Sequence, residues 1–286
     1  MAMAFALGAA VAAGEALRVH LGLGGLALQL ARGGLCSALA FLLIALLRLK
    51  VDRQPVAGLG LPGWRESVRT FGLGVLLTAL AAVITFGVGG VLGWVRFGEL
   101  AWPALLSFLG TNTAMAFLYE AFPEEFTLRG YTYGSLRSAW SRGAACLGTT
   151  ALFLLVPGLS SLFAAGLAMA LDVPAPAVAL VPAGEDPVAY FVLLAVFGVT
   201  LVIARIVTGS LWASIAVHLT VLAVNRLILA RGTGWSIELA SADALVLFPV
   251  YLLLTAGLFA LLGRWQGRAR SRPQNASRQD LAGGTP

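Results

Sequence analysis

The sequence has few charged residues: Asp, Glu, Lys and Arg make up 11% of its 286 residues, whereas hydrophobic residues make up 59%. Soluble domains contain about 25% charged residues, so this chain has too few polar side chains to cover a soluble surface. Its hydrophobic content also excludes an intrinsically disordered protein, because disorder requires low hydrophobicity and high net charge. The composition therefore predicts a polytopic membrane protein.

Histidine and cysteine are equally scarce, with two of each. A zinc centre needs three or four ligands, so we expect no metal site, and no motif indicates another cofactor. Cys36 and Cys146 lie in apolar runs without redox or metal-ligand spacing, which predicts small buried hydrophobic side chains. The sequence also contains no strand pattern and no glycine-rich phosphate loop following a strand.

Several apolar stretches reach the length of about 20 residues that a transmembrane helix needs. We expect an all-α, polytopic membrane helix bundle of about eight transmembrane helices, together with the lipid bilayer as a partner. The expected helices cover residues 3–22, a stretch ending at Leu47, 70–94, 102–122, a stretch from about 144 that Pro157 and Gly158 break or end, 188–207, 210–230 and 243–263.

The basic residues gather in a few places, namely 48–69, 129–142, Arg205 and the tail 264–286. Cytoplasmic loops of membrane proteins collect Lys and Arg. We therefore expect a multi-pass protein of the cell (plasma) membrane with both termini in the cytoplasm. The segment 172–187, with four prolines, three acids and no basic residue, is expected outside. The net charge of +6 thus reflects loop positions, and we expect no nucleic-acid partner.

Three regions are expected along the chain. Residues 1–47 hold the N-terminal transmembrane helices, and residues 48–263 form one membrane domain with its core at 100–230. Residues 264–286 are basic and contain Gly, Ser and Pro, which predicts a disordered cytoplasmic tail.

Acidic residues cluster at the expected end of the 102–122 helix. A charge near the bilayer centre costs about 2.5–3.5 kcal/mol on insertion scales, so such residues are functional candidates. Glu125 and Arg129 are four positions apart and can pair on a helix. Glu124 follows Glu120 by four positions, and a carboxylate in apolar surroundings suits a general base. The alternative interpretation is a salt-bridge cluster at a helix end in the membrane interface.

His218 is the second candidate, in the expected helix 210–230. Ser214 precedes it by one turn and Asn225 follows it by seven positions, so the three lie roughly on one helix face. A histidine there can carry a proton or stabilise an oxyanion. The alternative is a core histidine that is hydrogen-bonded to a neighbouring helix.

Three segments together resemble the CAAX prenyl endopeptidase and bacteriocin-processing (Abi, CPBP) family of intramembrane proteases. The run 123–131, Pro-Glu-Glu-Phe-Thr-Leu-Arg-Gly-Tyr, is similar to the family's E-E-x-x-x-R motif. Residues 208–212, followed by His218, resemble the segment that carries its last histidine. The loop 51–61 is similar to the one that often precedes the family's third span. The resemblance covers roughly residues 48–230.

The resemblance implies an all-helical endopeptidase in which a glutamate activates water for attack on a peptide carbonyl. A histidine in an F-x-x-x-H motif assists the glutamate, and the last histidine and an asparagine four positions later hold the oxyanion. Carried over, Glu124 is the base, Glu125 and Arg129 are supporting charges, and His218 is an oxyanion group. Glu120 or Glu125 takes the assisting place.

Two positions depart from this pattern. The F-x-x-x-H motif falls on residues 153–157, which end in Pro157, and the position four after His218 is Leu222. The nearest asparagine, Asn225, is about 10.5 Å from His218 along a helix axis. Two of the four chemical positions are therefore missing.

Three functions remain open on this reading. The first is an intramembrane endopeptidase, active or weakly active, that cleaves a hydrophobic or lipid-modified peptide. The second is a non-catalytic binding or scaffold protein, or bacteriocin-immunity protein, of the same fold, and the third is a small-solute transporter. The first predicts a cavity between the fourth, fifth and seventh helices that opens toward the cytoplasm. In it, Glu124 lies about 4–8 Å from the His218 ring, the span of one bridging water.

Overall fold

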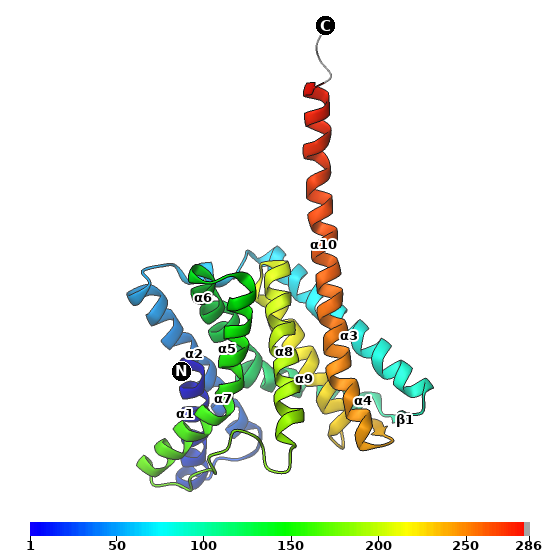
Figure 1. Cartoon of the computed structure of the whole chain (residues 1–286). Helices are drawn as coiled ribbons and strands as arrows, with labels where there is room; N and C mark the ends of the chain where they lie inside the picture. The colour runs from blue at the N-terminus through cyan, green and yellow to red at the C-terminus, as the bar shows by residue number, and fades with distance from the viewer. Residues whose placement is uncertain (283–286) are drawn as a thin grey trace.

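The computed structural model describes residues 1–282, and the side chains of residues 1–268. It confirms the all-α polytopic bundle (Figure 1). The elements in chain order are α1 (Ala2–Leu21), α2 (Gly25–Leu46), η1 (Leu47–Val51), η2 (Val56–Leu59), α3 (Trp64–Val91), β1 (Val95–Leu100), α4 (Trp102–Ala116), η3 (Phe117–Ala121), α5 (Phe122–Glu124), η4 (Glu125–Thr132), α6 (Tyr133–Ala139), α7 (Arg142–Ala170), α8 (Pro187–Thr208), α9 (Leu211–Leu229), β2 (Trp235–Leu239), η5 (Ala242–Val246) and α10 (Leu247–Ala282).

Seven helical stretches within the described residues are long and apolar enough to cross a membrane, which makes the chain an integral, multi-pass membrane protein. They are Ala2–Leu21, Gly25–Val51, Val56–Val91, Arg142–Ala170, Pro187–Thr208, Leu211–Leu229 and Ala242–Arg268. The expected span 102–122 is not among them. Its polar residues, among them Asn112 flanked by two threonines, are spread through the stretch.

The sequence predicted that the helix beginning at residue 102 ends at Phe122, and this prediction was wrong. Helical structure continues without interruption from Trp102 to Ala139 through α4, η3, α5, η4 and α6. η3 and η4 are π-helical. This conformation is rare in proteins, and where it occurs it often marks a functional site. The charges of Glu125 and Arg129 did not require a helix end at water, because both side chains are buried against other helices.

Pro157 does not break or end the fifth predicted helix, contrary to expectation. α7 runs through it, and the Ser160 hydroxyl donates to the Pro157 carbonyl at 2.8 Å. Close packing on α1 supports this stretch, since a Cβ atom at Gly8 would lie 2.6 Å from the Ser160 carbonyl oxygen. Neighbouring helices and hydroxyl groups make a proline tolerable in a membrane helix.

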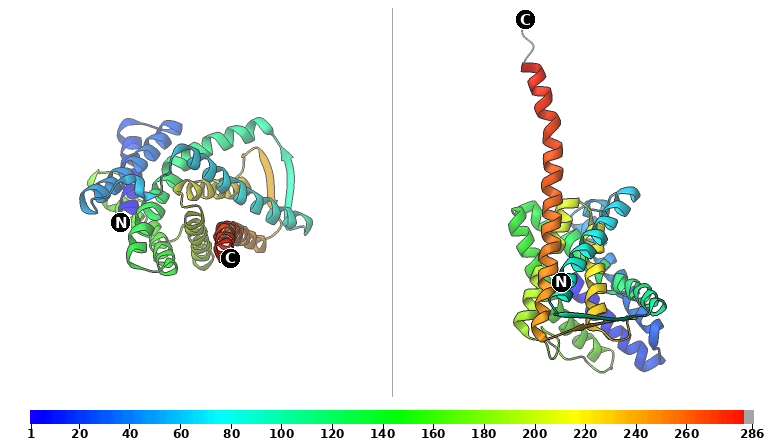
Figure 2. Two further views of the ribbon diagram at one scale, coloured as in Figure 1. Left: turned by 90° about the horizontal axis from the view of Figure 1, so that it is seen from above. Right: turned by 90° about the vertical axis from the view of Figure 1, so that its right-hand side faces the viewer.

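Two short strands, absent from the sequence interpretation, form an antiparallel pair. β1 and β2 pair Val95 with Leu239 and Phe97 with Ile237. They lie at the end of the bundle opposite to the one from which α10 projects (Figures 1 and 2). Their pairing is non-local, so neither strand carries a hairpin signal in its own sequence.

α10 extends well beyond the bundle (Figure 1) and ends at Ala282. The disordered tail expected for 264–286 stays a prediction, and residues 283–286 lie outside the described residues. A helix that is already formed adds residues without a new nucleation step, which favours this extension.

Candidate active site

The beginning of α9 is anchored by hydrogen bonds that fix the position of His218. The Ser210 hydroxyl caps the helix by accepting from the Trp212 backbone N–H at 3.2 Å, and it accepts from the Thr70 hydroxyl of α3 at 2.8 Å. The Leu211 N–H donates to the Gly60 carbonyl at 2.8 Å. His218 follows two turns later and is 2% exposed. The imidazole is thus held inside the bundle.

Glu125 and Arg129 form a fully buried ion pair on η4, with Arg129 Nη1 3.1 Å from Glu125 Oε1. Arg129 Nη2 also donates to the Gly198 carbonyl of α8 at 3.4 Å. The guanidinium lies over the Phe153 ring of α7, 4.7 Å from the ring centroid. A buried ion pair is tolerated only when its geometry and hydrogen bonds offset desolvation. Here α7 and α8 supply part of that offset.

The imidazole of His218 lies between the two glutamates. Its Nδ1 is 2.9 Å from Glu125 Oε1, and its Nε2 is 4.0 Å from Glu124 Oε2. The Phe197 ring of α8 meets the imidazole edge-on, with centroids 4.9 Å apart. An Nδ1–H that donates to Glu125 leaves Nε2 directed toward Glu124.

The distance between Glu124 and the His218 ring therefore lies at the lower end of the expected range of about 4–8 Å. At 4.0 Å the two atoms are too far apart for a direct hydrogen bond and close enough to share one water. The Glu124 side chain is 13% exposed, whereas that of Glu125 is fully buried. Of the two carboxylates, Glu124 is thus the one that can meet water or substrate.

Glu120 and Asn225 have their partners outside this cluster. Glu120 pairs with Arg226 of α9, and Arg226 Nη1 donates to Asn112 Oδ1 at 2.8 Å. Asn225 Oδ1 accepts from the Tyr251 hydroxyl of α10 at 2.7 Å. The structure brings Glu124, Glu125, Arg129 and His218 together, and it places these other two candidates in separate polar contacts.

The two motif positions that depart from the family pattern hold no polar group. Pro157 lies one turn beyond Phe153 on α7, and Leu222 packs against an apolar cluster that includes Leu219. Sequence reasoning missed Phe197, the Gly198 carbonyl and the contact of Phe153 with Arg129. Phe153 occupies the first position of the F-x-x-x-H motif, which could have indicated its contact with Arg129. No motif in the α8 sequence indicated a role for Phe197 or Gly198.

A polar cavity of about 290 Å³ opens one helical turn from Glu124. It is lined by residues of α2, α4, η3 and α9, namely Gln29, Arg32, Met115, Tyr119, Glu120 and Arg226. The sequence predicted a cavity between the fourth, fifth and seventh helices, which correspond to α4, α7 and α9. The observed cavity is lined by α2 instead of α7. Among the described residues, no group of three or more His, Cys, Asp or Glu side chains is arranged to hold a metal ion.

Comparison with protein families shows which known family part of the chain is similar to. Residues 106–224 match the model described as "Type II CAAX prenyl endopeptidase Rce1-like". The matched region contains the cluster of Glu124, Glu125, Arg129 and His218. Comparisons with curated proteins and with solved structures gave no significant match. The resemblance to the CAAX prenyl endopeptidase family is therefore confirmed, with the Rce1-like region at residues 106–224.

Proposed function

We propose that this protein is an intramembrane, glutamate-dependent endopeptidase that cleaves a hydrophobic or lipid-modified peptide. The observation that carries the proposal is the 4.0 Å separation of Glu124 Oε2 and His218 Nε2 beside a buried Glu125–Arg129 pair. We place the protein in the cell membrane with both termini in the cytoplasm, because its basic loops and tail follow the distribution typical of that side. This orientation counts the continuous helical stretch from Trp102 to Ala139 as an eighth crossing beside the seven apolar stretches.

In the proposed reaction, the Glu124 carboxylate takes a proton from a water molecule while the water oxygen bonds to the scissile carbonyl carbon. The carbonyl oxygen becomes an oxyanion, and it accepts a hydrogen bond from Nε2–H of a His218 that carries protons on both ring nitrogens. Glu124 then gives its proton to the leaving amine as the C–N bond breaks. Preorganised donors in a low-dielectric site stabilise such charge strongly.

Glu125 and Arg129 serve as positioning residues in this proposal. Glu125 Oε1 accepts from His218 Nδ1 and from Arg129 Nη1, so one carboxylate oxygen orients both cationic groups. Arg129 balances the charge of Glu125, which lets His218 hold its orientation inside the bundle.

A second function, a non-catalytic binding or scaffold protein of the same fold, is favoured by Pro157 and Leu222. The resemblance places a histidine and an asparagine at these two positions, and neither is present. This alternative predicts that a hydrophobic or prenylated peptide binds equally well to the wild type and to a Glu124→Ala, His218→Ala double variant, and that neither cleaves it.

The test uses the purified full-length protein in detergent and a fluorogenic prenylated peptide. We expect cleavage by the wild type and by Glu185→Gln, a control on the exposed loop before α8, and none by Glu124→Gln. Equal turnover by Glu124→Gln and the wild type would reject the glutamate mechanism. Peptide binding without cleavage by any variant would favour the scaffold.

A further inference from the structure

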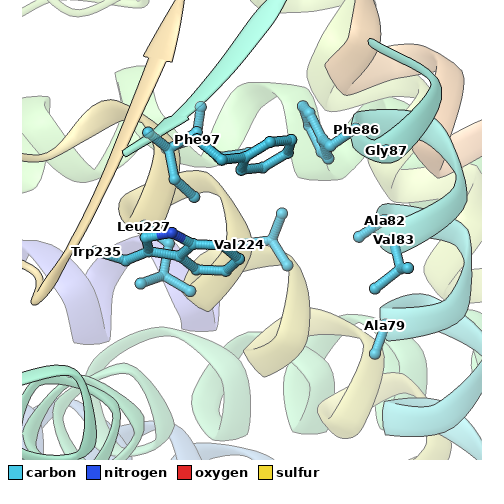
Figure 3. Close-up of a pocket in the computed structure, with 11 residues that line it drawn as sticks. Ala79, Ala82, Val83, Phe86, Gly87, Phe97, Val224, Leu227 and Trp235 are labelled. Atoms are coloured by element: carbon cyan, nitrogen blue, oxygen red, sulfur yellow. The ribbon is translucent and has the colours of Figure 1, made fainter. Parts of the chain in front are cut away.

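An apolar cavity of about 280 Å³ lies between α3, α9 and the β1–β2 pair, away from the acidic cluster. Figure 3 shows Phe97 and Trp235 on the strand side, Phe86 and Val83 on the α3 side, and Val224 of α9 between them. All of its lining side chains are apolar apart from the indole N–H of Trp235. A polar ligand would leave its own hydrogen-bonding groups unpaired here, which disfavours its binding. The lining therefore selects a hydrocarbon chain.

This cavity is separate from the proposed catalytic site. His218 points toward η4 and α8, whereas Leu227, nine positions later, is turned about 180° around α9 at 100° per residue. Ile228, at the far end of the cavity, is about 15 Å from His218 along the helix axis. The proposed peptidase function does not account for this space.

The cavity has an opening that a membrane lipid can use. Val83 is 70% exposed and Phe97 is 46% exposed, so the wall is open beside both. The space beside Gly87 is also empty, because a Cβ atom built on this residue would meet no other atom within 4 Å. Gly87 and Ala79 lie about 6 and 18 Å from the last residue of α3, Val91, along the helix. The cavity thus extends from the end of a membrane-spanning helix into its apolar middle.

A second, polar cavity of about 800 Å³ adjoins the first and shares Ile228, Trp235 and Ile237 with it. Arg231, Glu99 and Glu238 line this polar cavity and are exposed. None of the three makes an ion pair with another described residue. Glu238 stands opposite Arg96 in the strand pair and alternates with Ile237, so it faces away from the apolar cavity. Arg231 and Glu99 match the phosphate and the ammonium of a zwitterionic headgroup.

We propose that the two adjoining cavities bind one zwitterionic phospholipid. Its acyl chain lies between α3, α9 and the strand pair, and its headgroup lies with the phosphate at Arg231 and the ammonium at Glu99. This site is independent of the peptidase site.

The acyl-chain half is tested by photo-crosslinking in phosphatidylethanolamine vesicles that contain a trace of a lipid with a diazirine in its acyl chain. We expect crosslinks on the peptides that contain 79–87 and 224–228. Gly87→Leu fills the cavity and should reduce these crosslinks to the level of the lipid-facing surface. Gly72→Leu is the matched control on α3, because a Cβ atom there also meets nothing within 4 Å, and it should label like the wild type.

Ala79→Phe provides a second cavity-filling variant, so that the test does not depend on one substitution. Undiminished labelling of both peptides in a folded Gly87→Leu or Ala79→Phe protein would overturn the site. Glu124→Gln should label like the wild type, which separates this result from the outcome for the proposed peptidase.

The headgroup half is tested by changing the lipid. Labelling of the cavity should be stronger in phosphatidylethanolamine vesicles than in phosphatidylglycerol vesicles, because the latter lipid lacks the ammonium. Glu99→Gln should abolish this preference, whereas Glu238→Gln, opposite Arg96 in the strand pair, should keep it. Equal labelling in both lipids by the wild type would overturn the headgroup assignment.

Discussion

His218 and Glu125 are 93 positions apart in the chain, yet His218 Nδ1 lies 2.9 Å from Glu125 Oε1 inside the bundle. This contact joins α9 to η4 and leaves the other imidazole nitrogen directed toward Glu124. The two neighbouring glutamates therefore differ in their surroundings. Glu125 is enclosed and ion-paired with Arg129, whereas Glu124 remains partly accessible.

Glu125→Ala should destabilise the protein far more than Glu124→Ala does. Removing one partner from a buried ion pair leaves the other charge uncompensated and costs about 3–5 kcal/mol. Glu124 is not the direct partner of a buried cation, so its loss should affect cleavage rather than folding. The measurement is the free energy of unfolding in mixed detergent micelles. Equal destabilisation by the two substitutions would contradict the division of roles.

Phe153→Leu should weaken the protein by removing the aromatic face under Arg129. A cation–π contact contributes about 0.5–2 kcal/mol, and leucine retains most of the apolar side chain. Phe163→Leu is the control on the same helix, because its ring packs against Phe5 of α1 at a centroid distance of 5.6 Å. Only Phe153→Leu should also lower cleavage, since only it touches the positioning arginine. Comparable loss of cleavage in both variants would contradict this.

Local patterns in the sequence were sufficient for most helices and for one of the site contacts. Apolar runs placed spans such as 188–207 close to the observed α8, and the four-residue spacing of Glu125 and Arg129 gave their ion pair. Both inferences depend only on residues within a few turns of each other. The same locality explains why the sequence predicted too early an end for the fourth helix. Charged residues indicate the end of a membrane helix unless neighbouring helices bury them, and those neighbours cannot be identified from local sequence.

Contacts between distant segments could not be predicted from the sequence. The pairing of β1 with β2 joins segments that are about 140 positions apart, and no hairpin turn connects them. Asn225 and Tyr251 meet because α9 and α10 pack together, which a helix-face argument within α9 does not reveal. The resemblance grouped His218 with the glutamates, although their residue spacing alone indicated no contact.

The pair of Glu120 and Arg226 should contribute modestly to stability and not to cleavage. Both side chains are about one-third exposed, which limits an ion pair to about 0.2–1 kcal/mol. A double-mutant cycle with Glu120→Gln and Arg226→Gln should give a coupling energy in that range, while turnover stays at the wild-type value. A large loss of turnover in Glu120→Gln alone would instead give Glu120 an assisting role beside Glu124.

Pro157→His should raise peptidase turnover. The chain turns at Trp140 and Ser141 between α6 and α7, and the Phe153 ring of α7 lies under the guanidinium of Arg129. We expect residue 157, one turn or about 5.4 Å further along α7, to approach Glu124 and Glu125. A histidine there completes the F-x-x-x-H pattern and should bring a second imidazole near Glu124, the proposed general base. The measurement is the ratio of kcat/KM to that of the wild type.

Pro157→Ala is the control for this substitution, because it also restores a backbone N–H to α7 without adding a functional group. Any gain that comes from a straighter or more stable helix should appear in Pro157→Ala as well as in Pro157→His. A gain specific to the histidine should disappear when Glu124→Gln is added, because the new imidazole acts only through that carboxylate. Equal turnover in Pro157→His and Pro157→Ala would show that residue 157 does not reach the acidic cluster. The loss of the family histidine would then not be what limits catalysis in this chain.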